Sequence, residues 1–76
     1  MKIQTVNVVE YNQTDENFIG ITSFSDDAEG NKEAEEHFLS VIKENGADID
    51  TEEDKTFFLV EGNFEKGGYQ AVLIHS

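Results

Sequence analysis

The chain has 76 residues, no cysteine and a net charge of −12, because 17 acidic side chains face five lysines and no arginine. This balance argues against direct binding to nucleic acid or to anionic membranes, since both contacts need cations. The lack of cysteine excludes disulfides and thiolate metal sites. No apolar run reaches the about 18 residues of a membrane span, and the N-terminus lacks a signal-peptide pattern, so we expect a cytoplasmic protein.

The length predicts one domain, residues 1–76. Ile3–Tyr11 is rich in β-branched residues and predicts a first strand, and Phe18–Phe24 predicts a second. The polar segment Asn12–Asn17 between them is short enough to predict a hairpin.

One helix is predicted between Ser25 and Gly46. Its apolar residues recur at a 3.6-residue period and form one face. Asp26 with Glu29 fits a capping box, and Gly46 fits a left-handed cap. Gly30 is an apparent flaw that costs about 1 kcal/mol relative to alanine, so a second start at Asn31 stays open. The predicted apolar face consists of Ala34, Phe38, Val41 and Ile42.

The second half of the chain predicts an acidic loop and two further strands. Ala47–Lys55 reads as the loop, Thr56–Phe64 as a third strand, and Tyr69–His75 as a fourth. Glu65–Gly68 predicts the turn between those strands, with two glycines free to take positive φ. The apolar run Ala71–Ile74 favours a central position for the fourth strand.

The predicted fold is therefore α+β, in the order ββαββ, with a four-stranded antiparallel sheet and one helix packed on one face. These strands alternate poorly, so the face without the helix stays substantially apolar. Large apolar patches mark contact sites, which predicts a homodimer or a partner protein on that face. The alternative is that twist and bulges bring these residues into the single core. The predicted interface consists of Phe58, Val60, Phe64, Tyr69 and Leu73.

No catalytic, cofactor or metal site is predicted. The acidic loop begins like an EF-hand, but Glu53 stands at the glycine position and Leu59 at the twelfth position. His37 and His75 are the only imidazoles and have no metal-site spacing. The carboxylates of the helix lack a pocket that would separate their pKa values. We expect a protein that is not an enzyme.

The carboxylates suggest a sharper hypothesis. A rigid domain with a dense carboxylate surface can imitate nucleic-acid phosphates and occupy the basic groove of a nucleic-acid-binding protein. The alternative is that the charge serves solubility alone. The predicted acidic surface consists of Asp26, Asp27, Glu29, Glu33, Glu36, Asp48, Asp50, Glu52, Glu53 and Asp54.

In size, acidity and α+β pattern, the chain resembles small phage or mobile-element proteins that inhibit restriction, CRISPR or other nucleic-acid-handling systems. The resemblance covers no specific motif and carries over no functional residue. It implies an inhibitor that binds a basic protein. The second hypothesis is a homodimeric interaction module that uses the apolar open face of its sheet.

Overall fold

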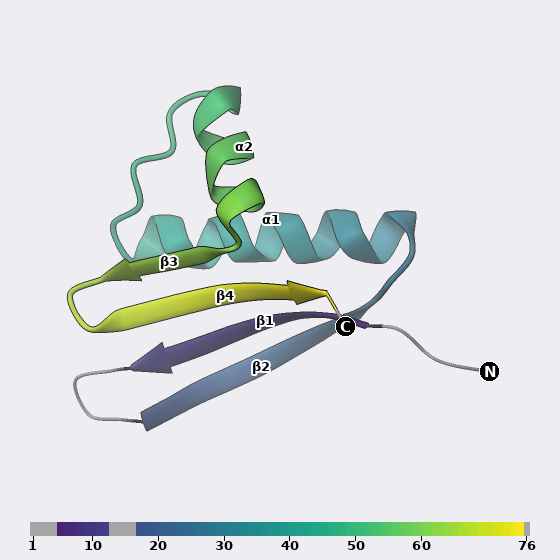
Figure 1. Ribbon diagram of the computed structural model, residues 1–76, viewed down its shortest axis with the longest axis horizontal. Helices are drawn as coiled ribbons and strands as arrows, with labels where there is room; N and C mark the ends of the chain where they lie inside the picture. The colour runs from purple at the N-terminus through teal and green to yellow at the C-terminus, as the bar shows by residue number, and fades with distance from the viewer. Residues whose placement is uncertain (1–4, 13–16, 76) are drawn as a thin grey trace.

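An antiparallel sheet and two helices make up the described part of the computed structural model, residues 5–12 and 17–75 (Figure 1). The α+β class and the four-stranded antiparallel sheet are confirmed, but the single helix is wrong, since the order is ββααββ. The strand order in the sheet is β2-β1-β4-β3. The elements are β1 (Thr5–Asn12), β2 (Asn17–Ser25), α1 (Ala28–Glu44), α2 (Glu52–Glu61), β3 (Asn63–Lys66) and β4 (Tyr69–His75).

The first two strands pair as the predicted antiparallel hairpin, with a register shift between Glu10 and Tyr11. Ile3, at the start of the predicted first strand, and residues 13–16 of the predicted turn lie outside the described residues. β4 lies between β1 and β3, which confirms its central position. Because β1 also pairs on both sides, the two inner strands are the first and last of the sequence.

The predicted third strand, Thr56–Phe64, is wrong: most of it belongs to α2. A capping box starts this helix. The hydroxyl of Thr51 accepts a hydrogen bond from the backbone N–H of Asp54, and the carboxylate of Asp54 accepts one from the backbone N–H of Thr51. Gly62 ends it at φ 62°, with its N–H donating to the carbonyl of Phe58 at 2.9 Å. Local signals at both ends thus fix a helix in a segment rich in strand-forming residues.

β3 begins only at Asn63 and forms a hairpin with β4. Lys66 pairs with Tyr69, so Gly67 and Gly68 form a two-residue loop, at φ 60° and 88°. A type I′ turn needs positive φ at both central residues, and glycine adopts it without strain. The glycine pair is therefore the turn, whereas the first half of the predicted turn, Glu65–Lys66, belongs to the strand.

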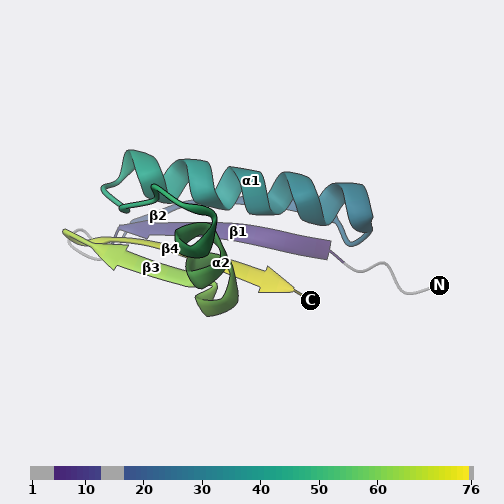
Figure 2. The ribbon, with the colours of Figure 1, turned by 90° about the horizontal axis from the view of Figure 1, so that it is seen from above.

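The core lies between α1 and one face of the sheet (Figure 2). α1 buries Gly30, Ala34, Phe38 and Ile42, which recur at every fourth residue. Three of these were predicted from the apolar period, while Val41 is half-buried at the edge. The core cluster consists of Val8, Phe38, Ile42, Ala47, Ile49 and Ala71.

Both ends of α1 are capped. The N-cap is Asp27 rather than the predicted Asp26, and its carboxylate accepts from the N–H of Gly30 at 2.6 Å. At the other end Gly46 takes φ 103°, as predicted. The N–H of Ala47 donates to the carbonyl of Ile42 at 2.9 Å, which completes a Schellman motif. This turn directs Ala47 into the core cluster, so the loop predicted as acidic also adds apolar residues to the core.

Gly30 is not a flaw in α1. It is buried, and a Cβ at this position would clash with the carbonyl oxygen of Ser25. Glycine at this position therefore permits the close approach of α1 to the end of β2, and the helix runs through it without a second start at Asn31. Neither helix of the described residues is long and apolar enough to cross a membrane.

Candidate protein-binding surface

The predicted acidic surface divides into two groups of carboxylates. One lies at the start and on the exposed face of α1, and the other in the segment that leads into α2. The starts of the two helices are well separated in Figure 1. All ten side chains are exposed except Asp54, which is half-buried. The carboxylates therefore form two separate clusters and no continuous array.

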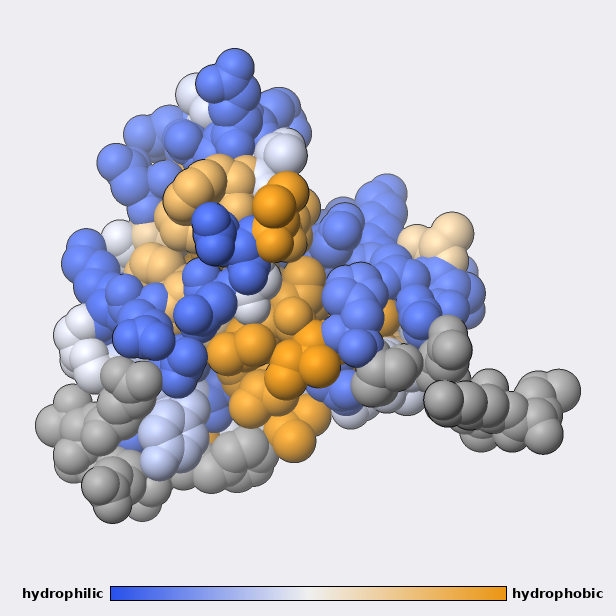
Figure 3. Space-filling model, viewed as in Figure 1, coloured by the Kyte–Doolittle hydropathy of each residue, from blue (hydrophilic) through white to orange (hydrophobic). Residues whose placement is uncertain are grey.

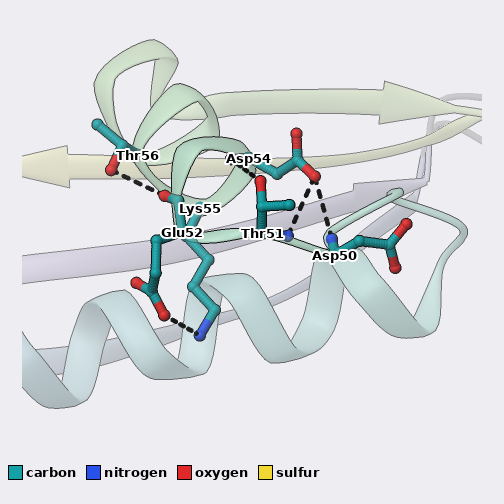
Figure 4. A network of polar contacts seen from close by, with 6 residues as sticks. All are labelled: Asp50, Thr51, Glu52, Asp54, Lys55 and Thr56. Carbon is teal, nitrogen blue, oxygen red and sulfur yellow. Dashed lines mark hydrogen bonds and ion pairs between the residues drawn. The ribbon is translucent and has the colours of Figure 1, made fainter.

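Part of this charge stabilises the helices locally. The carboxylate of Asp54 accepts from the backbone N–H groups of Asp50 at 3.1 Å and Thr51 at 3.3 Å (Figure 4). Glu52 pairs with Lys55 at 3.2 Å, one turn further along α2. Acidic groups near a helix N-terminus interact favourably with the helix dipole. These contacts give part of the acidic segment a structural role that does not depend on a partner.

Two carboxylates of the loop before α2 crowd each other. A side-chain hydrogen bond between Asp50 and Asp48, together with the negative charge of Asp48, raises the pKa of Asp50 above its usual range. Both side chains are exposed. A cation placed beside them would relieve this repulsion, because an opposite charge favours the ionised form of both groups.

No group of three or more His, Asp or Glu side chains is arranged to hold a metal ion in the described part of the chain. In the segment that resembles the start of an EF-hand, Glu52 opens α2 and Asp54 is hydrogen-bonded to backbone N–H groups. Part of the acidic segment thus forms the start of α2.

Four of the five residues predicted for the apolar interface pack against the core cluster: Phe58, Phe64, Tyr69 and Leu73. The ring of Phe64 lies 5.9 Å from that of Phe58, in an edge-to-face contact, and 6.5 Å from that of Tyr69. Val60 alone is well exposed, at 80% of its surface, and it lies on α2 instead of a strand. The side of the sheet away from α1 therefore presents other residues.

An apolar stripe crosses the open face of the sheet. Val9 of β1 pairs with Ile21 of β2 and with Val72 of β4, so the three side chains form a row across neighbouring strands. Ile74 lies two residues beyond Val72 and therefore on the same face. Ile21 and Ile74 are 55% and 43% exposed. We call Val9, Ile21, Val72 and Ile74 the open-face stripe. Figure 3 shows an apolar band on this side of the molecule, and α1 lies behind the sheet in that view.

The strand residues around the open-face stripe are almost free of charge. Among the described strand residues that face away from α1, Glu65 is the only charged one. Ser23 donates to Asn7 at 2.5 Å beside the stripe. On the other side Gln70 donates to Asn63 and Glu65, at 3.1 and 3.2 Å. In a chain with 29% charged residues, this face combines apolar side chains with paired, uncharged polar ones.

Polar side chains also lie at the contact between α1 and the sheet. Nε2 of His37 lies 4.0 Å from a carboxylate oxygen of Glu10, and its ring is 5.8 Å from that of Phe24. His37 is half-buried beside the apolar face of α1. The hydroxyl of Tyr69 is buried and has no hydrogen-bond partner within the described ranges. Burial, together with the charges of Glu10 and Glu44, raises the pKa of Tyr69 to about 12.

We expect the wild-type protein to lose stability at alkaline pH as Tyr69 ionises, and the Tyr69→Phe variant to lack this loss. Because the folded-state pKa of about 12 exceeds the reference value of 10.0, the contribution of the neutral phenol is complete below about pH 10 and is lost as the pH rises towards 12. At pH 7 the free energy of unfolding should stay equal or rise by up to about 1 kcal/mol, since a hydroxyl without a partner disappears. Urea unfolding of both proteins at about pH 7, 9 and 11 measures the difference. A difference that does not change with pH would contradict this assignment.

Comparison of this chain with protein-family models, with curated proteins and with solved structures finds no match. The candidate surface is therefore defined by the geometry of this chain alone. Two regions stand out in it: the open-face stripe and the separated carboxylate clusters of the two helix starts.

Proposed function

We propose that this protein acts in the cytoplasm by binding another protein, without catalysis, and that the open-face stripe is the centre of the contact. The observation that supports this proposal is the near absence of charge on the open face of a chain with a net charge of −12. Depletion of charge at the centre is the compositional mark of protein interfaces. Exposed Ile21 and Ile74 would supply the apolar anchors.

The partner that fits is a protein with a basic surface around an apolar contact. Hydrophilic residues lie on both sides of the apolar band in Figure 3. Exposed carboxylates at the two helix starts add negative charge at the periphery of the molecule. Complementary charges at a rim accelerate association and reject acidic partners, while the apolar centre holds the complex together.

The test uses the immobilised protein and host lysate, with bound proteins eluted by a rising salt gradient and then purified. The double variant Ile21→Ser with Ile74→Ser should weaken binding of a captured basic protein at least about tenfold, which is about 1.4 kcal/mol. Both side chains are about half exposed, so the fold should persist. The matched control is Ser40→Ala, on the exposed side of α1, which should bind like wild type.

A second candidate function is inhibition of a basic nucleic-acid-binding protein by imitation of phosphates. The observation that favours it is a row of exposed carboxylates on α1, formed by Glu29, Glu33 and Glu36. A helix rise of about 1.5 Å per residue places neighbours in this row about 6 and about 4.5 Å apart along the axis. The crowded pair Asp48 and Asp50 adds a second site of concentrated charge.

The same capture experiment separates the two candidates. If imitation of phosphates is the mechanism, lysine at both carboxylate clusters together should abolish capture, and added DNA or RNA should displace the partner. The changed positions are Glu29, Glu33 and Glu36 in one cluster and Asp48, Asp50, Glu52 and Glu53 in the other. If the isoleucine variant alone loses the partner, the open-face stripe is the site. A captured basic protein that tolerates both sets of changes would contradict both candidates.

A further inference from the structure

The two edges of the sheet are protected very differently. β3 forms one edge, has only four residues, includes Glu65 and Lys66, and lies beside α2. β2 forms the other edge with nine residues. In Figure 1 none of the described elements lies along the outer side of β2. An uncovered edge strand exposes unpaired N–H and C=O groups to any strand that can pair with it.

β2 also lacks the side chains that usually block such pairing. Its sequence, NFIGITSFS, has no charged residue and no proline. Natural edge strands are commonly shielded by lysine, by proline or by inward-pointing charge. Ile19 and Ile21 are 52% and 55% exposed on this strand. β2 has one feature that hinders pairing at its edge, a register shift opposite Glu10 and Tyr11. This shift interrupts the start of β2 and leaves Gly20–Ser25 as the regular segment.

We propose that β2 of one copy pairs antiparallel with β2 of a second copy through Gly20–Ser25, so that two molecules form one eight-stranded sheet. A second copy fits this edge for two reasons. The seam contains no charged side chain, so direct pairing brings no carboxylates face to face. An edge strand is also self-complementary in antiparallel pairing about a two-fold axis. The assembly closes at two copies, because α2 lies beside the remaining edge.

This dimer goes beyond the proposed function, and it forms whether or not the open-face stripe binds a basic partner. Two molecules of charge −12 repel each other through Asp26 and Asp27, which follow β2 directly, and through the rest of the surface. Salt screens this repulsion, with a Debye length of about 10 Å at 0.1 M and about 3 Å at 1 M. Self-association should therefore strengthen with salt, whereas binding of a basic partner should weaken. The opposite signs make failure of one proposal distinguishable from failure of the other.

The first test is sedimentation velocity of the intact chain at about 0.1 M and about 1 M salt. We expect the 8.5 kDa chain to shift towards twice that mass as protein concentration rises, and more readily at high salt. Thr22→Lys should raise the dimer dissociation constant at least about tenfold. Thr22 is exposed and pairs with Val8, which places it on the side of the sheet away from the open-face stripe.

Two variants serve as matched controls. Thr22→Val keeps a β-branched residue and should retain the dimer. Ser40→Lys changes the net charge equally, on the exposed side of α1, and should also retain it. A chain that stays monomeric at both salt concentrations overturns the proposal, and so does a dimer that is indifferent to Thr22→Lys.

Single cysteines locate the seam, since the chain has none of its own. Two-fold pairing places one residue directly opposite its counterpart, within the distance that a disulfide can bridge. Among Ile21→Cys, Thr22→Cys and Ser23→Cys, one variant should therefore cross-link much faster than the others on oxidation. Asn63→Cys, on the edge beside α2, should not cross-link. Faster cross-linking at Asn63→Cys, or equal rates at all four positions, would overturn the β2 seam.

Discussion

Replacing Phe38 by alanine is expected to remove most of the free energy of unfolding at neutral pH. Its side chain is fully buried at the centre of the contact between α1 and the sheet. Truncation of a buried phenylalanine costs about 3–5 kcal/mol, because the lost transfer free energy adds to the cost of the cavity. A chain of this size has a free energy of unfolding near the lower end of about 5–15 kcal/mol. The expected loss is therefore comparable with the whole stability.

Phe57→Ala is the matched control, since it makes the same change on the other helix. Phe57 is 59% exposed, and its ring lies 5.3 Å from that of Phe58 in an edge-to-face contact. We expect its free energy of unfolding to fall by no more than about 1 kcal/mol. Circular dichroism with urea titration measures both variants. Equal destabilisation by the two changes would contradict this prediction, because it would mean that the core also includes Phe57 on α2.

The sequence predicted α1 and the strands at both ends of the chain correctly, because each has a strong and regular pattern. Ala34, Phe38 and Ile42 recur at the helical period, and only a helix buries all three on one side. The β-branched residues of β1 and the apolar run of β4 favour strands that are buried between neighbours. Local pattern and tertiary burial agree at these positions.

α2 was mispredicted because two local signals disagree. Phe57–Val60 is a continuous apolar run, and such a short run fits a buried strand as well as a helix. The deciding residues lie at its ends: Thr51 and Asp54 form the capping box, and Gly62 forms the left-handed cap. The capping box was visible in the sequence, where its acidic residues were assigned to a loop.

The error in α2 carried over to the candidate site. Its apolar residues were expected on an open sheet face, although Phe58 packs against the core from a helix. The apolar residues on the face of the sheet without a helix are instead Val9, Ile21, Val72 and Ile74. Their row depends on the register of three strands, which is determined by pairing across the sheet and not by any one segment.

Gly30 shows how a residue that is unfavourable locally can be required by packing. Helix propensity alone predicts that alanine would stabilise this position by about 1 kcal/mol. The position lies in the first turn of α1, directly against the backbone of Ser25 at the end of β2. The sequence cannot show this approach, because it results from how the link between β2 and α1 turns back over the sheet.

We therefore expect Gly30→Ala to destabilise the protein by about 2–3 kcal/mol, near the upper end of the cost of overpacking. The new methyl group would overlap the carbonyl oxygen of Ser25 and lie 2.8 Å from its carbonyl carbon. These are backbone atoms, so relief requires movement of the whole link. Such movement would also disturb the N-cap bond from the N–H of Gly30 to Asp27. Urea unfolding measures the loss, and amide hydrogen exchange should show its largest increase in the first turn of α1.

Gly20→Ala is the control that separates this clash from a general effect of removing glycine. Gly20 lies in β2, and a Cβ there would meet no atom within 4 Å. The change should leave the free energy of unfolding equal, or raise it by up to about 1 kcal/mol, because alanine restricts the unfolded chain. If Gly30→Ala is instead as stable as Gly20→Ala, the link before α1 can move aside freely. The close contact between Ser25 and Gly30 would then not be what positions α1 on the sheet, and the buried stripe that ends in Ile42 would position it alone.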